Sequence, residues 1–278
     1  RFSFFSIDMQ ERIIQRTILE DQVRTALQNQ EFQIHLQPIL CAKSLTVTGC
    51  EVLARWWRNE TYMSPELFIK LSEETGQILA VGQQILSQTL DASLKLPKGQ
   101  SISINISPKQ FAKPSVIADI LATIDRHSID NHSIYFEITE TTFLDHTDTT
   151  IETFNLITQA GIRIALDDFG TGFSSISHLQ NYPIDRVKVD RALIVGAAER
   201  EKDAKILSGL LTLLNGIGLE TVVEGVETPE QAHICQELGA DTIQGYHYCK
   251  PLPVEDYLNY LNDLEQQAQK ESRKARSS

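Results

Sequence analysis

Along most of the chain, short apolar runs alternate with longer stretches in which apolar residues recur every three or four positions. The short runs have the period of β-strands, and the longer stretches have the period of amphipathic helices. The pattern predicts strands at 32–39, 46–55, 101–106, 134–138, 162–167, 185–190, 220–224 and 241–244. It predicts helices at 65–74, 77–95, 114–127, 148–160, 174–181, 191–216, 229–238 and 254–264.

The order of these elements favours a closed barrel. Only residues 41–45 separate the first two strands, so we expect that pair to be antiparallel. The later strands alternate with helices, which implies parallel pairing through crossover connections. Eight strands with intervening helices predict an α/β fold, a (β/α)8 TIM-like barrel with one antiparallel strand. A doubly wound open sheet is the alternative, and it would place its site at a single switch point.

The two ends of the chain differ from the repeating part. Apolar residues recur with helical spacing over 8–28, at Ile13, Ile14, Ile18, Val23 and Leu27. Because the first residue is Arg1, we expect residues 1–28 to connect the domain to an upstream sensory region of a longer protein. The barrel should then span 29–264, and we expect the polar tail at 265–278 to be frayed or disordered.

Each predicted strand has one apolar face and one face that ends in a polar group. In the strand at 134–138, Ile134, Phe136 and Ile138 oppose Tyr135 and Glu137. The apolar face should pack on the helices, so the other face should look into the barrel. The polar residues that end six successive strands are Asn105, Glu137, Asp167, Lys188, Glu224 and Gln244. One of them could be a strand-end cap or half of a buried ion pair, but six in succession favour a site at the C-terminal face of the barrel.

Several of these positions could bind metal through hard oxygen atoms. The candidate ligands are Glu51, Asn105, Glu137, Asp167 and Asp168. Oxygen ligands select Mg²⁺ or Mn²⁺ over zinc, and the chain contains no HExxH motif. Asp167 and Asp168 are adjacent, so they can converge only if the strand breaks there, and Gly170 and Gly172 could turn the chain. A converging pair can bridge two metals about 3.5–4 Å apart. A plain Asp-Gly turn is the alternative.

The charge of the chain narrows the possible partners. It has 25 basic and 37 acidic residues, which gives a net charge of -12. This balance argues against general binding to DNA or RNA polymers or to anionic membranes, because such binding needs a basic surface. An acidic protein that handles a phosphate ester needs a local positive charge, which a metal ion can supply.

The cysteines and the apolar runs indicate in which cellular compartment the protein works. Cys41, Cys50, Cys235 and Cys249 form no CxxC pair and no recognisable disulfide framework. We therefore expect free thiols in a reducing cytoplasm. No apolar run approaches the roughly 18 residues of a transmembrane helix. The chain could still be the cytoplasmic part of a membrane-anchored protein.

Sequence motifs in a fixed order connect the chain to a known family. They are Gln37-Pro38-Ile39, Glu51-Val52-Leu53-Ala54-Arg55-Trp56, Asn105-Ile106-Ser107-Pro108, Glu137-Ile138-Thr139-Glu140, Asp167-Asp168-Phe169-Gly170-Thr171-Gly172-Phe173-Ser174-Ser175, Lys188-Val189-Asp190, Glu224-Gly225-Val226-Glu227-Thr228, Gln244-Gly245-Tyr246 and Lys250-Pro251-Leu252-Pro253. Each motif alone is weak, but the ordered set strongly resembles the EAL-domain family of cyclic di-GMP phosphodiesterases over residues 20–262.

The resemblance implies a two-metal site that hydrolyses cyclic di-GMP to linear 5′-pGpG, with Mg²⁺ or Mn²⁺ as cofactor, in a homodimer. The metal ligands that it implies are Glu51, Asn105, Glu137 and Asp167 for one ion, and Asp167 and Asp168 for the other. The catalytic residues that it implies are Glu224 as general base, Lys188 beside the water and phosphate, and Glu51. The substrate contacts that it implies are Gln37, Arg55, Asp190 and Gln244, and the anchors of the 168–175 loop are Glu140 and Glu227.

Small departures from the family pattern leave every ligand in place. Val52 stands where the signature has Ala, and it adds two methyl groups on the face opposite Glu51, so we expect little effect on that ligand. Leu36 stands where an aromatic residue is common, and Val223 stands where Ala is usual. Inactive members of the family lack one or more of the carboxylates, and this chain keeps them all.

Other interpretations stay open at this point. Lys188 could form an ion pair in the barrel interior with Asp167 or Glu137, and Arg55 could form a salt bridge on the rim. The chain could also be a cyclic di-GMP receptor that does not hydrolyse the nucleotide, or a protein-interaction module on an eroded barrel.

Overall fold

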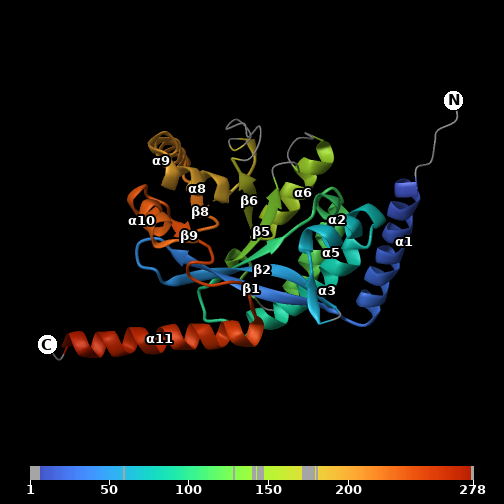
Figure 1. The fold of residues 1–278 in the computed structure, drawn as a ribbon, viewed down its shortest axis with the longest axis horizontal. Coiled ribbons are helices and arrows are strands. Elements are labelled where there is room, and N and C mark those ends of the chain that lie inside the picture. The colour runs from blue at the N-terminus through green and yellow to red at the C-terminus, as the bar shows by residue number, and fades with distance from the viewer. Residues whose placement is uncertain are drawn as a thin grey trace.

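The structure is a computed structural model, drawn in Figure 1, that describes residues 7–276 except 59, 128, 140–141, 143–146, 171–178 and 180. Side chains are described for these residues between 17 and 268 and at 270. Eight of the described strands close into a barrel in the order β1-β9-β8-β7-β6-β5-β4-β2, because β1 pairs with both β9 and β2.

Eight strands agree closely with the expected runs, whereas the short β3 and β10 were not predicted. Their bounds are β1 Phe32–Cys41, β2 Val47–Arg58, β3 Thr61–Met63, β4 Ser101–Asn105, β5 Ile134–Thr139, β6 Arg163–Phe169, β7 Arg186–Val189, β8 Glu220–Val223, β9 Thr242–Ile243 and β10 Leu252–Pro253. Strand β1 is antiparallel to both of its barrel neighbours, and the other neighbours in the barrel are parallel. The predicted barrel with one antiparallel strand is confirmed, and the open sheet is excluded.

Helices cover the outside of the barrel. Their bounds are α1 Ile7–Gln28, α2 Pro65–Thr75, α3 Ile78–Ser93, α4 Pro108–Phe111, α5 Pro114–Asp125, η1 Asn131–Ser133, α6 Asp148–Gln159, α8 Arg191–Glu199, α9 Glu201–Gly216, α10 Pro229–Glu237 and α11 Val254–Arg276. Figure 1 shows α1, α2, α3 and α5 on one side and α8, α9 and α10 on the other. None of the described helices is long and apolar enough to cross a membrane.

The predictions for one helix and for the C-terminal tail are wrong, and a further helix prediction falls largely outside the described residues. The helix predicted at 191–216 is two helices, because Arg200 has extended dihedrals and the chain turns there. Gly196 lets the turn close tightly, since a Cβ at this position would lie 3.0 Å from a carboxylate oxygen of Asp203. The tail expected to fray from 265 continues as α11, whose residues there are mostly good helix formers. The helix predicted at 174–181 lies almost entirely outside the described residues.

The apolar faces of the strands and helices form one core around the barrel. Val187 and Val189 of β7 are fully buried, as are Leu207, Leu211 and Leu214 of α9. Truncating a leucine in such a position to alanine costs about 2–5 kcal/mol. The regular alternation along β7 therefore fixes which face looks into the barrel and keeps Lys188 on that inner face.

A polar cluster closes the end of the barrel opposite the strand C-termini. Arg186 at the start of β7 is 2% exposed, and its guanidinium lies 3.6 Å from the ring centroid of Tyr135. Its Nη2 donates to both carboxylate oxygens of Glu220 at 3.0 Å, and Tyr135 donates its hydroxyl hydrogen to the same carboxylate at 3.0 Å. Because this cluster closes one end of the barrel, the end at the strand C-termini is the open mouth.

Candidate active site

The C-terminal ends of the strands bring the predicted residues together at one mouth. Glu137 comes from β5, Asp167 from β6, Lys188 from β7 and Glu224 from the residue after β8. A cavity at this mouth is lined by Gln37, Glu51, Leu53, Asp167, Lys188, Arg191, Glu224, Gly225, Glu227, Gln244, Gly245 and Tyr246. Residues that are up to about two hundred positions apart in sequence therefore share one space.

Lys188 lies at the centre of this mouth. Its Nζ is 2.7 Å from Glu137, 2.8 Å from Glu224, 3.1 Å from Asp167 and 3.3 Å from Glu51. The side chains of Lys188 and Glu137 are almost completely buried. The interior ion pair considered for Lys188 is thus present, and it extends to four carboxylates rather than one.

Amide side chains hold Glu51 in position. Asn105 donates its Nδ2 hydrogen to one Glu51 oxygen at 2.9 Å, and Gln244 donates to the other oxygen at 2.7 Å. Gln244 also donates to Gln37, which in turn donates to the backbone oxygen of Cys249. Val52 is buried in the core on the strand face opposite Glu51, and its small effect on that ligand stays a prediction.

Asp167 and Asp168 converge through a bulge in β6, so the predicted strand break is wrong. Between two paired positions, β6 advances from Leu166 to Phe169 while β7 advances only from Val187 to Val189. The extra residue is accommodated because Asp168 has a φ of 58°, in the left-handed region. The strand continues through Phe169, and both carboxylates face the mouth with Glu224.

Burial and charge push the pKa values of these groups in different directions. Burial raises the pKa of Glu224 to about 8 against the lowering effect of Lys188. Burial, with the charge of Glu51 added, raises the pKa of Glu137 well above its ordinary value. Burial also opposes ionisation of Glu51, but Lys188 and the two amide donors bring its pKa below the ordinary value. Burial lowers the pKa of Lys188, and the surrounding carboxylates outweigh it and raise that pKa overall.

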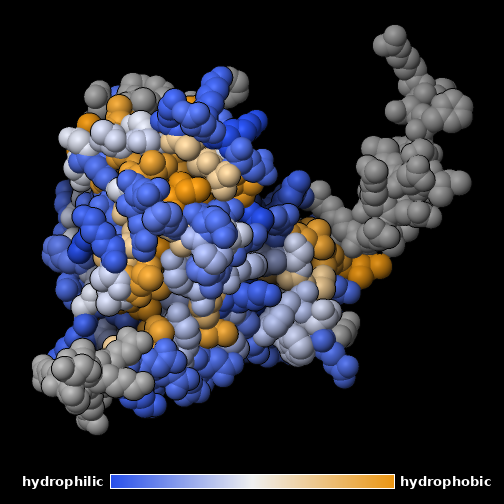
Figure 2. All heavy atoms as spheres, turned by 60° about the vertical axis from the view of Figure 1, so that its left-hand side comes forward, coloured by the Kyte–Doolittle hydropathy of each residue, from blue (hydrophilic) through white to orange (hydrophobic). Residues whose placement is uncertain are grey.

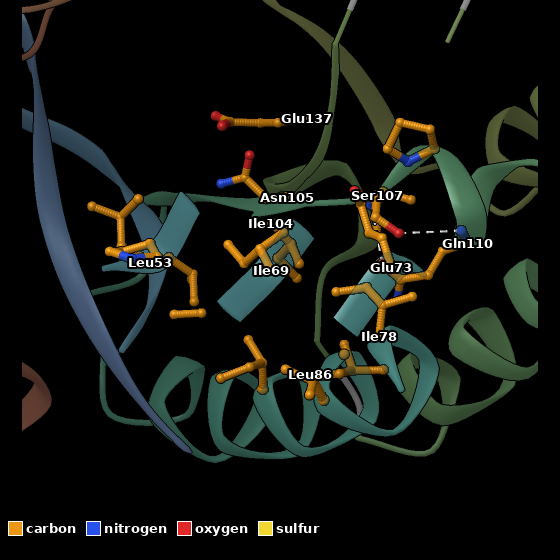
Figure 3. A pocket seen from close by; sticks show the side chains of 18 of the residues that line it. Leu53, Ile69, Glu73, Ile78, Leu86, Ile104, Asn105, Ser107, Gln110 and Glu137 are labelled. Atoms are coloured by element: carbon orange, nitrogen blue, oxygen red, sulfur yellow. Dashed lines mark hydrogen bonds between the residues drawn. The ribbon is translucent and has the colours of Figure 1, made fainter. Parts of the chain in front are cut away.

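The donor atoms at the mouth fit hard divalent cations. Among the described residues, Glu137 Oε1 and Gln244 Oε1 are buried without a hydrogen-bond partner. The amide oxygen of Asn105 points toward Glu137 (Figure 3). Three carboxylates with oxygens within 4.8 Å of one another are those of Asp167, Asp168 and Glu224. One ammonium cannot balance this many carboxylates, and carboxylate and amide oxygens are the ligands that a hard cation prefers.

The residues predicted to contact substrate lie around the mouth in different settings. Arg55 donates to the backbone oxygen of Ala54, and no rim salt bridge pairs it with a carboxylate among the described residues. Gln37 and Gln244 are buried in the network that holds Glu51. Asp190 caps α8 by accepting a hydrogen bond from the backbone of Ala192 at 2.8 Å. Their contacts with substrate stay predictions.

The two predicted loop anchors have different outcomes. Glu227 pairs with Arg191 at 2.9 Å, which ties the segment after β8 to the start of α8. Glu140 lies outside the described residues, as does most of the 168–175 loop. The role of both residues as loop anchors stays a prediction.

Sequence reasoning missed Arg191 and Tyr246, which both line the mouth. Arg191 lies across Gly225, where a Cβ would be 2.5 Å from the Arg191 side chain and where φ is 65°. Tyr246 is 54% exposed, and Lys250 Nζ lies 5.6 Å from its ring centroid. Arg191 directly follows Asp190, and Tyr246 lies two residues after Gln244, so the available indication was closeness to a residue that ends a strand motif.

Comparison with known proteins agrees with this geometry. The EAL domain sequence model matches residues 20–251. The cyclic di-GMP phosphodiesterase PdeL of Escherichia coli is 33% identical over 87% of this chain and 68% of its own. The EAL enzyme Bd1971, in a structure with cAMP and cyclic di-GMP bound, superposes with a TM-score of 0.84 at 31% identity, over 90% of this chain and 70% of that one.

Further relatives differ in how much of their own length this chain covers. The PaMucR phosphodiesterase, in complex with c-di-GMP, has a TM-score of 0.81 at 31% identity, over 86% of this chain and 99% of that one. MucR itself is a protein of Pseudomonas aeruginosa. The chain spans 38%, 29% and 34% of the first three curated relatives, the last of which is the signaling protein YkoW of Bacillus subtilis. The matched sequence model, the shared fold and the assembled mouth show that this chain belongs to the EAL domain family.

Proposed function

We propose that this domain hydrolyses cyclic di-GMP to linear 5′-pGpG with two Mg²⁺ or Mn²⁺ ions. The observation that carries the proposal is the convergence of Glu51, Asn105, Glu137, Asp167 and Asp168 at one mouth with Lys188 and Glu224. Two relatives named above, PdeL and MucR, are phosphodiesterases of this nucleotide, which supports the same substrate for this chain.

The side chains at the mouth would have different roles in the reaction at the phosphate. Glu224, with oxygens near those of Asp167 and Asp168, would accept the proton of the attacking water. Bound divalent cations would lower the pKa of that water and would neutralise the negative charge of the phosphate oxygens. Lys188 would stabilise negative charge that develops during the reaction, and Arg55 and Arg191 would hold the phosphates from two sides of the mouth.

The test is hydrolysis across a metal series. Purified protein with Mg²⁺ or Mn²⁺ should convert cyclic di-GMP to pGpG, measured by chromatography of the product. Calcium should inhibit, because it prefers a looser and higher coordination than magnesium. Replacement Glu51→Ala should lower the rate by more than about 100-fold, whereas Glu152→Ala, at an exposed position of α6, should leave it unchanged.

Two other outcomes would replace the proposal. Binding of the nucleotide without cleavage under any metal would make the domain a receptor. Failure to bind the nucleotide at all would favour a protein-interaction module.

We further propose that the domain forms a homodimer and works in the cytoplasm. Helix α9 has an uncharged outer stripe with Ile206 50% exposed, Leu213 37% exposed and, just after the helix, Ile217 46% exposed. Figure 2 turns the side of the molecule that carries α9 toward the viewer and shows orange side chains among the blue ones. The four described cysteines are free thiols, which supports a reducing compartment.

A further inference from the structure

The barrel wall opens on one side, between β2 and β4. Their pairing ends at Val52 and Ile104, but β2 continues to Arg58 as a hairpin with β3. Through this opening a cavity of about 320 Å³, here called the lateral cavity, runs from the mouth to the helices outside the barrel. Figure 3 shows its lining side chains, with Asn105 and Glu137 at one edge and Leu86 of α3 at the opposite edge.

The lateral cavity has an aliphatic body. The apolar side chains that line it from the helices and the wall include Ile69, Ile78, Val81, Leu86, Ile104 and Ile120. Protein interiors leave few voids larger than a water molecule, and pockets for small molecules start at about 300 Å³. The lateral cavity is therefore large enough for a compact ligand, and its opening at the mouth provides a way in.

An amide group is placed at the inner end of the lateral cavity. Gln110 is 5% exposed, and its side-chain oxygen accepts a hydrogen bond from the backbone of Ser107 at 3.0 Å. Its Nε2 has no hydrogen-bond partner among the described residues and lies against Gly82, where a Cβ would be 2.3 Å away. Glycine inside a helix is unfavourable, so Gly82 makes room for this amide at the expense of α3. Figure 3 shows Gln110 across the cavity from Leu53.

The charges around the lateral cavity restrict what can enter. Glu51, Glu73 and Glu137 contribute carboxylates to the lining, and Arg55 contributes the single guanidinium, at the end where β2 leaves the barrel. An anionic molecule would meet three carboxyl groups and only one guanidinium there. A neutral body with a hydrogen-bond acceptor suits both the aliphatic wall and the free Nε2 hydrogen of Gln110.

We propose that the lateral cavity is a second ligand site, which takes a small neutral molecule with an apolar body and an acceptor for the Gln110 amide. The aliphatic body of this site lies between the barrel wall and the helices, and its opening shares Glu51 and Leu53 with the phosphate-handling mouth. Its walls include β2 and β4, which carry Glu51 and Asn105, so a bound molecule is in position to shift these two side chains. If the proposed hydrolysis holds, the ligand and cyclic di-GMP will alter each other's affinity by the same factor.

The test is direct binding of a matched pair of probes. Naphthalene-2-carboxamide is neutral and offers a carbonyl acceptor, and naphthalene-2-carboxylate has nearly the same shape with a negative charge. Calorimetry on the intact chain, without nucleotide or metal, should show at least tenfold tighter binding of the amide. Equal binding of the carboxylate would contradict the assigned chemistry. Because no hydrolysis is measured, this result is independent of the proposed enzyme activity.

Variants locate the binding. Ile69→Trp should fill the lateral cavity, and Gln110→Glu should keep the oxygen that caps α4 while removing the donor, so each should weaken binding of the amide at least tenfold. Leu67→Trp, on the same helix as Ile69 but 49% exposed, is the control and should bind as the original chain does. Unchanged binding in both cavity variants would overturn the proposal.

A second measurement does not depend on the folding of any variant. Nuclear Overhauser contacts between the naphthalene protons and the methyl groups of Ile69, Ile78 and Leu86 are expected in the original chain. Contacts to other methyl groups only would overturn the assignment. If saturating pGpG abolished binding of naphthalene-2-carboxamide, the lateral cavity would belong to the nucleotide site. That result would also overturn the proposal of a second ligand site.

Discussion

The carboxyl groups at the mouth show how one chemical group acquires different properties from its neighbours. Glu51 receives two amide hydrogen bonds besides its pairing with Lys188, and its pKa falls below the ordinary value. Glu137 has Lys188 on one oxygen and no partner on the other, and its pKa rises. Both side chains are buried and both face the same ammonium, so the difference comes from the negative charges of Glu51 and Asp167 beside Glu137 and from the amide donors on Glu51.

The raised pKa of Glu224 predicts a stability that depends on pH. A carboxyl with a pKa of about 8 in the folded state and about 4.5 when unfolded binds its proton more tightly when folded. The free energy of unfolding should therefore fall as the pH rises from about 4.5 to about 8, by more than ~1 kcal/mol. Urea unfolding in EDTA at several pH values measures this, and saturating Mg²⁺ or Mn²⁺ should reduce the loss.

The control is Glu224→Gln, which removes the titrating group at nearly the same size. Other groups contribute to the pH dependence in both proteins, including His35, whose pKa is lowered by burial and by Arg55. The difference between the two curves therefore isolates Glu224. Parallel curves over this pH range would show that the carboxyl titrates normally in the folded state.

At the residue level, strand alternation explains why so many site residues could be predicted. Alternation assigns each side chain of a strand to one face, and it correctly placed Glu137, Asp167 and Lys188 at the mouth. Arg191 and Tyr246 follow the strand ends, where alternation no longer gives a direction. The lateral cavity was also beyond prediction, because it depends on where β2 stops pairing with β4.

Among the elements, β6 combines regular pairing with an irregular functional end. Its bulge turns two adjacent aspartates toward the same side, which a regular strand cannot do. Asp168 has the required left-handed backbone, a conformation that aspartate and asparagine tolerate better than most residues. Position 168 therefore needs a residue that tolerates the left-handed backbone and, for a separate reason, a carboxylate that faces the mouth.

Two substitutions at Asp168 separate these demands. Asp168→Asn keeps a side chain suited to the left-handed backbone and removes the charge, so it should fold with unchanged or higher stability and lose most activity. Asp168→Ala should lose as much activity and also be less stable than the Asn variant by about 1 kcal/mol. Chemical denaturation and product chromatography measure the two effects. Equal stability of the two variants would show that the bulge places no demand on this side chain.

The two helices at 191–216 show the limit of reasoning from periodicity at this scale. At 3.6 residues per turn, the buried Leu207 and Leu211 lie roughly 90° around the helix from Ile194 and Ala197, so the apolar phase shifts between the two pairs, but the shift does not say at which residue the chain turns. The turn at Arg200 needs neither Gly nor Pro at that position. It depends on packing between α8 and α9, which the sequence does not display.

On the scale of the whole molecule, the barrel could be predicted because its connections are local. The short link after β1 fixes an antiparallel pair, and each later crossover fixes a parallel one. Assembly between molecules is different, because the apolar surface stripe of α9 is exposed in the described part of the chain and its partner would be another molecule. Helix α9 buries Leu207, Leu211 and Leu214 on its inner side while Ile206 and Leu213 stay largely in water.

The proposed dimer predicts a mass of about twice 31.3 kDa in solution, measured by light scattering during size-exclusion chromatography. Replacing Ile206 and Leu213 together by glutamate should give a monomer, because four charges would then face one another across a symmetric contact. The change is on the exposed side of α9, so the fold should be retained. Ile151→Glu is the control, since Ile151 of α6 is 49% exposed and lies outside the stripe. A monomeric original chain, or a double variant that still dimerises, would exclude this helix as the contact surface.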